Sequence, residues 1–265
     1  MMRTLVRNAA LCFGFLLVFA GILVLAAAPP DETPLKAPLP GNFIVSQHGK
    51  SVGTAAFEIT TTTHGYNSTS VVQVAMTGLN YSLSKTEVLS PANHLRHVLL
   101  SAAINGSAVT VTAAPDTARM LLNISANGHS STTPLALHSG AVFLPDFDPG
   151  ALNTLLALAA AGNNRDLWAI LPKQAGSVAP VQLATYADEQ GTLDGKPIVV
   201  HHLIATIAGQ VTDLFSGPDN ELLQAELPQP GFALVRRGFV LTPPAKAGAP
   251  PVQFTQPDQP PPVAQ

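Results

Sequence analysis

The sequence has little charge and only one cysteine. Asp, Glu, Lys and Arg make up 11% of its 265 residues, whereas about 25% is usual in globular proteins. The cysteine, Cys12, lies in the first apolar run, so the chain after that run contains neither a disulfide nor a thiol nucleophile. Thirteen basic residues against sixteen acidic ones give no basic surface of the kind that neutralises phosphates. We therefore expect no nucleic-acid partner.

Motifs for hydrolytic catalysis are also missing. The pentapeptide Gly-x-Ser-x-Gly, which places a nucleophilic serine on a sharp turn, does not occur. A triad of His138, Ser139 and Asp213 can be imagined, but no motif supports it.

Paired carboxylates for sugar cleavage require two acids on opposite sides of a cleft. The sequence does not place Glu58, Glu87 or Asp188 relative to one another. A hydrolase is thus the least favoured of the functions that we consider, and we predict no catalytic residue.

The eight histidines do not form a metal motif. His94 and His97 are three residues apart, a spacing that diverges on a strand, where neighbours on one face are two apart. His201 and His202 are adjacent and should point to opposite faces of a strand. The segment 146–148 resembles the start of a calcium loop but lacks the closing glutamate. We predict neither a metal nor a cofactor.

A long apolar run near the N-terminus decides the predicted compartment. Residues 9–28 contain no charge and no amide, and as a helix they would extend about 30 Å, enough to cross a bilayer. Arg3 and Arg7 precede the run, whereas Asp31 and Glu32 follow it. This order of charges would leave the following chain outside the cytoplasm. We predict an exported protein with membrane contact through residues 9–28.

The run permits two interpretations, a cleaved signal peptide or a retained anchor. Ala26-Ala27-Ala28 resembles a cleavage site, but cutting after Ala28 would leave Pro29 first. Val24 and Ala26 permit an earlier cut. The protein is accordingly expected either to be periplasmic or to be anchored at the inner membrane with its domain outside the cytoplasm.

Proline marks the limits of the expected domain. Residues 29–41 hold five prolines and are typical of a semi-rigid linker, and residues 242–265 are typical of a disordered Pro-rich tail. Between them, residues 42–241 are long enough for one domain with a hydrophobic core. Residues 1–28 are expected to form the signal peptide or anchor.

The expected domain is mainly β. Val, Thr, Ser and Tyr dominate its segments, and Asn105-Gly106 and Asn127-Gly128 are strong hairpin signals. Further turns are expected at His48-Gly49, at Asp194-Gly195 and at 217–220. We predict strands at 42–47, 52–61, within 68–89, and at 98–104, 107–112, 120–125, 129–135, 167–172, 181–187, 198–208, 212–215, 221–227 and 232–241.

One buried helix is expected at about 149–161. Asp148 can cap it, Pro149 suits its first position, and Gly162 can end it. Leucines and alanines leave the segment without a polar face, so it should be buried across the concave side of a sheet. The predicted fold is a curved antiparallel sheet, either a half-barrel or a sandwich-like arrangement, with this helix.

Several short segments resemble an uncharacterised family of bacterial envelope proteins. These are Gly49-Lys50-Ser51-Val52-Gly53-Thr54, Asp194-Gly195-Lys196, Asn220-Glu221-Leu222-Leu223 and Phe232 to Arg236. The resemblance covers about residues 42–241. It implies a curved half-barrel like that of the lipoprotein carriers LolA and LolB, with helices in the concavity. No arginine or tryptophan here matches the cargo site of those carriers.

The resulting functional prediction is a non-catalytic envelope protein that binds a lipid or another apolar ligand between sheet and helix. The alternative is an envelope scaffold with a filled core, which would bind a partner protein through its Pro-rich tail. An apolar cavity of a few hundred Å³ would favour the first prediction over the second. For Arg236-Arg237 we expect one solvated side chain and one packed stem, although such a pair can also bind an anion or a partner carboxylate. Trp168 is expected to be a core or cavity-lining residue.

Overall fold

The computed structural model describes residues 34–162, 166–173, 176–229 and 231–242. In these ranges one helix, α1 (Pro149–Ala160), accompanies seventeen strands. The first nine strands are β1 (Gly41–Gln47), β2 (Lys50–Thr62), β3 (Gly65–Met76), β4 (Leu79–Leu89), β5 (Leu95–Ile104), β6 (Ser107–Asp116), β7 (Arg119–Ala126), β8 (His129–Ala136) and β9 (Gly140–Phe143). The others are β10 (Leu167–Leu171), β11 (Ser177–Thr185), β12 (Glu189–Leu193), β13 (Lys196–Ile207), β14 (Gln210–Ser216), β15 (Leu222–Glu226), β16 (Phe232–Arg236) and β17 (Phe239–Leu241).

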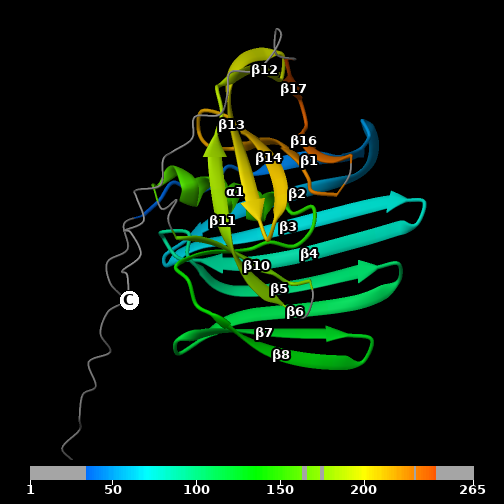
Figure 1. The fold of residues 1–265 in the computed structure, drawn as a ribbon, viewed down its shortest axis with the longest axis vertical. Coiled ribbons are helices and arrows are strands. Elements are labelled where there is room, and N and C mark those ends of the chain that lie inside the picture. The colour runs from blue at the N-terminus through cyan, green and yellow to red at the C-terminus, as the bar shows by residue number, and fades with distance from the viewer. Residues whose placement is uncertain (1–33, 163–165, 174–175, 230, 243–265) are drawn as a thin grey trace, which may run out of the picture. The chain divides into compact units, whose positions relative to one another are not determined.

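All seventeen strands belong to one large, curved sheet that does not close (Figure 1). From β8 back to β1 the strands pair with their sequence neighbours, and β1 also pairs with β16. Beyond β16 the order is β15, β14, β13, β11, β10 and β9. β12 pairs with the first half of β13, and β17 pairs with β12. The predicted mainly β fold with a curved sheet and one helix is confirmed for the described residues.

The residues in the hairpin turns explain most of the pairing register of the strands. Asn105-Gly106 and Asn127-Gly128 both have positive φ at both positions, as two-residue hairpin turns require. His48-Gly49 and Asp194-Gly195 adopt the same conformation. The four turns connect β1 to β2, β5 to β6, β7 to β8 and β12 to β13, and the sequence predicts a turn at each of these positions.

Two short strands, β9 and β12, were not predicted, and the single strand predicted at 232–241 is instead two strands, β16 and β17. β9 is a fully buried stretch, Gly-Ala-Val-Phe, that pairs in parallel with β10, so the sheet is mixed rather than antiparallel throughout. β12 has a mostly polar sequence, and its pairing with β13 and β17 supplies its hydrogen bonds. Neither segment shows the apolar alternation on which strand prediction relies.

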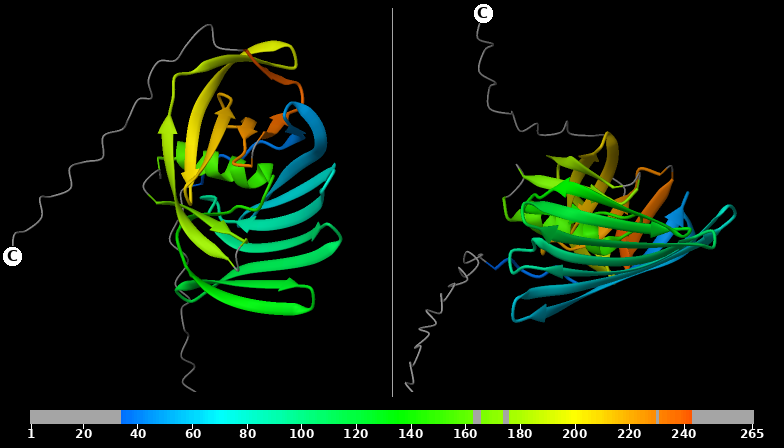
Figure 2. Two further views of the ribbon diagram at one scale, coloured as in Figure 1. Left: turned by 45° about the vertical axis from the view of Figure 1, so that its right-hand side comes forward. Right: turned by 90° about the horizontal axis from the view of Figure 1, so that it is seen from below.

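The helix lies on the concave side of the sheet, as Figure 2 shows. It packs against β2, β3, β9, β10 and β15, and Leu152, Leu155, Leu156 and Leu158 are buried in the main core. A smaller cluster of Val200, Phe215, Leu223 and Phe239 covers the other side of the β13 to β15 region. The sheet thus curves around a helix that is apolar on nearly all sides, which gives that helix a dry environment.

The end of the predicted linker packs against the domain. Leu35 donates its backbone N–H to the carbonyl of Pro91 at 2.9 Å and accepts the Tyr66 hydroxyl at 2.7 Å. Leu35 and Ala37 contact the main core. These apolar side chains explain why residues 34–40 lie against the sheet, and β1 starts directly after them.

No helix of the described residues is long and apolar enough to cross a membrane. The predicted span at 9–28 lies outside those residues, and so does the tail from residue 243.

Candidate functional site

The start of α1 places the residues of the candidate site. Asp148 is the N-cap, and its Oδ1 accepts backbone N–H groups from Gly150 at 2.9 Å and from Ala151 at 3.3 Å. Pro149 occupies the first helical position. These observations confirm the predicted capping role of Asp148, since a carboxylate here satisfies N–H groups that have no partner within the helix.

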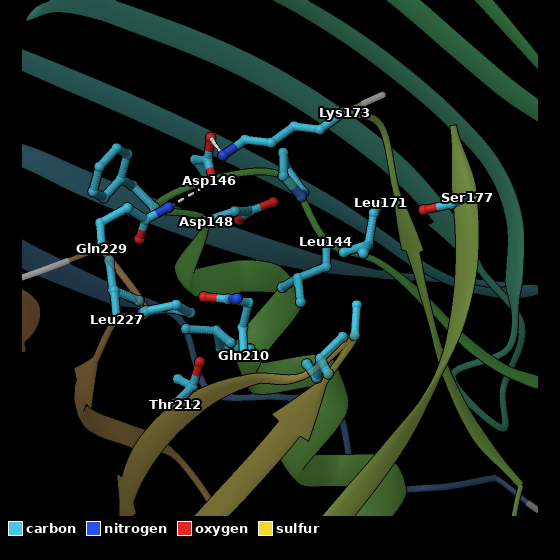
Figure 3. A pocket seen from close by; sticks show the side chains of 16 residues that line it. Leu144, Asp146, Asp148, Leu171, Lys173, Ser177, Gln210, Thr212, Leu227 and Gln229 are labelled. Carbon is cyan, nitrogen blue, oxygen red and sulfur yellow. Dashed lines mark hydrogen bonds and ion pairs between the residues drawn. The ribbon is translucent and has the colours of Figure 1, made fainter. Parts of the chain in front are cut away.

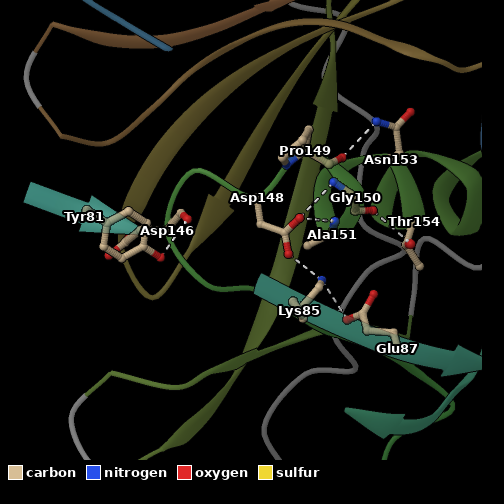
Figure 4. A network of polar contacts seen from close by, with 10 residues as sticks. All are labelled: Tyr81, Lys85, Glu87, Asp146, Asp148, Pro149, Gly150, Ala151, Asn153 and Thr154. Atoms are coloured by element: carbon tan, nitrogen blue, oxygen red, sulfur yellow. Dashed lines mark hydrogen bonds and ion pairs between the residues drawn. The ribbon is translucent and has the colours of Figure 1, made fainter. Parts of the chain in front are cut away.

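Asp148 also belongs to a buried ionic cluster, which consists of Lys85, Glu87 and Asp148 (Figure 4). The ammonium of Lys85 forms an ion pair with Oδ2 of Asp148 and lies 2.9 Å from Oε1 of Glu87. All three side chains are excluded from solvent. The cluster therefore joins the concave face of β4 to the N-terminus of α1.

Burial changes the proton affinities in this cluster. Burial raises the pKa of Glu87, although the ammonium of Lys85 acts in the opposite direction. For Lys85 burial lowers the pKa, but the carboxylates of Asp148 and Glu87 more than offset this, so that its pKa is raised. The carboxyl groups thus help to keep Lys85 protonated, and burial makes Glu87 easier to protonate than an exposed glutamate.

A cavity of about 570 Å³ lies next to the cluster, between the start of α1 and the strand ends around β10, β13, β14 and β15 (Figure 3). Asp148 belongs to both features. Apolar side chains form most of the cavity wall, and they include Leu144, Phe147, Leu152, Leu171, Ile207 and Leu227. The space between the start of the helix and these strand ends is thus not completely filled.

Polar groups gather at one side of the cavity. Asp146 forms an ion pair with Lys173 at 2.6 Å and accepts the side-chain amide of Gln229 at 3.0 Å. The Lys173 side chain is 61% exposed, which leaves its ammonium accessible to solvent. Tyr81 donates its hydroxyl to the carbonyl of Asp146 at 3.3 Å. An apolar wall with a few convergent polar groups is the usual arrangement in a small-molecule site.

Tyr81 illustrates the low polarity of this region. Burial raises its pKa well above the ordinary range, and the carboxylates of Asp146 and Asp148 raise it further. The phenol therefore stays neutral and acts as a hydrogen-bond donor.

His201 and His202, which the sequence predicts to point to opposite faces of a strand, have separate surroundings in the structure. His201 contacts Asp188 at 2.9 Å, whereas His202 lies between Glu189 at 3.1 Å and Asp213 at 2.9 Å. His202 also stacks on Tyr186 and Phe215. The two rings have different partners, as the prediction of opposite faces requires. The described residues contain no group of three or more His, Cys, Asp or Glu that could hold a metal ion.

The imagined hydrolase triad does not assemble. Ser139 donates its hydroxyl to Asp166 at 2.9 Å, and the ring of His138 stacks on Trp168 with centroids 3.8 Å apart. Asp213 contacts His202 instead. Trp168 also donates its indole N–H to Asp166, and these two hydrogen bonds lower the pKa of Asp166.

The other candidates also have separate environments. Glu58 is exposed, Glu87 is buried beside Lys85, and Asp188 contacts His201. Arg236 donates to the carbonyl of Pro40 at 3.0 Å, which ties β16 to the segment before β1. Glu87, Asp188 and Arg236 thus have structural partners.

Lys85 was missed at the sequence level, although the sequence contains a signal for it. Along β4 the inward positions are Tyr81, Leu83, Lys85, Glu87 and Leu89. A lysine and a glutamate two residues apart on the apolar face of an alternating strand indicate a buried ion pair. The partner from α1 could not be found in this way, because Asp148 is distant in sequence.

No family model matches the chain, and neither a curated protein nor a solved structure matches it significantly.

Proposed function

We propose that the domain is a non-catalytic binding protein for an amphiphilic ligand with one apolar chain, such as a fatty acid or a lipid. The observation that carries the proposal is the cavity of about 570 Å³ between sheet and helix. Ligand sites commonly enclose about 300–1,000 Å³ and have mostly apolar walls. The resemblance to half-barrel lipoprotein carriers agrees with this ligand class.

The polar side of the cavity suggests how such a ligand would be oriented. Its chain would contact Leu144, Leu171 and Ile207, whereas a small anionic head group would lie near the ammonium of Lys173. The Lys173 side chain is largely exposed. Its ammonium can therefore change its ion-pair partner from Asp146 to a ligand carboxylate and still remain partly hydrated.

We further propose that the protein acts outside the cytoplasm, released from or anchored to the inner membrane. This proposal rests on the apolar run at 9–28 and its flanking charges. The scaffold alternative remains a prediction about the tail from residue 243, which lies outside the described residues.

Titration with a fluorescent fatty acid tests the binding proposal. The wild-type protein should bind saturably, and Leu171→Glu should weaken binding at least tenfold because it places a carboxylate in the apolar wall. Leu137→Glu is the matched control, since Leu137 is an exposed leucine that does not line the cavity. Circular dichroism checks that both variants are folded. Absence of saturable binding to the wild-type protein, or equal binding by both variants, would overturn the proposal.

A further inference from the structure

The buried ionic cluster contains two carboxyl groups for one ammonium, one more than a salt bridge requires. Lys85, Glu87 and Asp148 are all excluded from solvent, although burying three ionisable groups costs considerable free energy. Among the described residues, Oδ2 of Asp148 contacts only Lys85, and Oε2 of Glu87 has no hydrogen-bond partner. Oγ of Ser70, which lies opposite Lys85 on the neighbouring strand, has none either. The cluster therefore contains buried polar atoms that do not use their full hydrogen-bonding capacity.

The same geometry suits the formation of an amide. The Nζ atom of Lys85 contacts the carboxyl group of Asp148, which is the arrangement of a nucleophile and its electrophile (Figure 4). The other carboxyl oxygen, Oδ1, accepts the backbone N–H groups of Gly150 and Ala151. Two fixed N–H donors at a helix N-terminus would stabilise negative charge on that oxygen as a tetrahedral intermediate forms.

Glu87 is placed to move a proton. Its Oε1 lies 2.9 Å from Nζ of Lys85, within the range for direct proton transfer. Burial raises its pKa, which favours the uptake of a proton by its carboxylate. Exclusion of solvent also lowers the free-energy cost of converting the ion pair into a neutral amine and a neutral acid, since both charges disappear together.

We propose that Lys85 and Asp148 condense spontaneously to an intramolecular isopeptide bond, with Glu87 as the proton-transfer residue. A proton first passes from the Lys85 ammonium to the Asp148 carboxylate, which gives an amine and a carboxylic acid. Nζ then attacks Cγ of Asp148, and the carbon–nitrogen bond forms while Oδ1 takes up the negative charge. Glu87 accepts a proton from the attacking nitrogen and returns one to Oδ2.

The bond from Cγ to Oδ2 then breaks, and Oδ2 leaves as water. The products are one amide, one water molecule and Glu87 in its starting protonation state. No oxidant, reductant or further reactant is needed. The new bond would tie β4 to the start of α1 and hold the helix in the concavity of the sheet.

Mass spectrometry of the purified full chain tests this proposal. The intact mass should be lower than the sequence mass by one water molecule, after allowance for any leader cleavage. Trypsin should fail to cut after Lys85, and fragmentation should show one branched peptide that joins residues 85 and 148. Localisation is necessary because Asp194-Gly195 can also lose water, and that loss would leave Lys85 unmodified.

Two variants separate chemistry from packing. Glu87→Gln keeps Lys85 and Asp148 but cannot accept and return the proton, so the branched peptide should fall at least tenfold. Glu58→Gln is the matched control on an exposed strand position, and it should retain the full branched peptide. If folded wild-type protein yields separate peptides with a free Lys85 and a free Asp148, the proposal is wrong, whatever the variants do. An undiminished branched peptide in Glu87→Gln would remove Glu87 from the reaction.

Discussion

The exposed ion pair at the cavity permits a sharp test of ligand orientation. We predict that Lys173→Ala weakens the binding of a fatty acid about 10- to 100-fold, which corresponds to the roughly 1.5–3 kcal/mol of a hydrogen bond to a charged group. The effect on folding should be small, because the Lys173 side chain is 61% exposed. Exposed ion pairs contribute at most about 1 kcal/mol to stability.

Lys36→Ala is the matched control for this measurement. Lys36 forms an ion pair with Asp219 at 2.6 Å, its side chain is 62% exposed, and it does not line the cavity. Isothermal titration calorimetry with a fatty acid and with its uncharged alcohol should show a loss in Lys173→Ala for the acid only. Equal affinities of Lys173→Ala and Lys36→Ala for the acid would refute the proposed orientation, and an equal loss for both ligands would show that the charge of Lys173 is irrelevant.

Three further predictions concern stability and pH. Leu155→Ala should lower the free energy of unfolding by about 2–5 kcal/mol in chemical denaturation, because Leu155 is fully buried in the α1 interface; a loss below about 1 kcal/mol would contradict the packing. Ser70→Ala should leave stability unchanged or raise it by up to about 1–3 kcal/mol, since its buried hydroxyl has no hydrogen-bond partner in the described part of the chain; a clear loss of stability would reveal an unrecognised hydrogen bond. Burial raises the pKa of Glu87 in the folded state. As the pH rises, Glu87 therefore loses its proton in the unfolded chain first, at about pH 4.3. Above that pH the free energy of unfolding should fall. Glu87→Gln should make this dependence weaker, and an unchanged slope would count against the shift.

Much of the fold follows from local signals in the sequence. Asn105-Gly106 and Asn127-Gly128 determine the hairpins because their backbone conformation is intrinsically available to those residues. Asp148 and Pro149 predict the start of the helix for the same kind of local reason. β9 could not be found, because four apolar residues acquire strand structure only through the parallel partner β10.

The candidate site depends on contacts that are distant in sequence. Alternation along β4 places Lys85 and Glu87 on the inner face, but only the fold brings Asp148 to them. The cavity likewise arises where α1 meets strand ends from β10 to β15. Its volume is a property of packing, and no residue pattern determines whether such a space is filled.

The central claim is that the cavity between sheet and helix holds an apolar ligand. Organic extraction of the protein after purification without detergent tests it most directly, with the extract analysed by mass spectrometry. We predict a fatty-acid-like or lipid-like compound from the wild-type protein and a clear reduction from Leu171→Glu, with Leu137→Glu as the control. An empty extract from the wild-type protein, together with no binding of added fatty acid, would contradict the account.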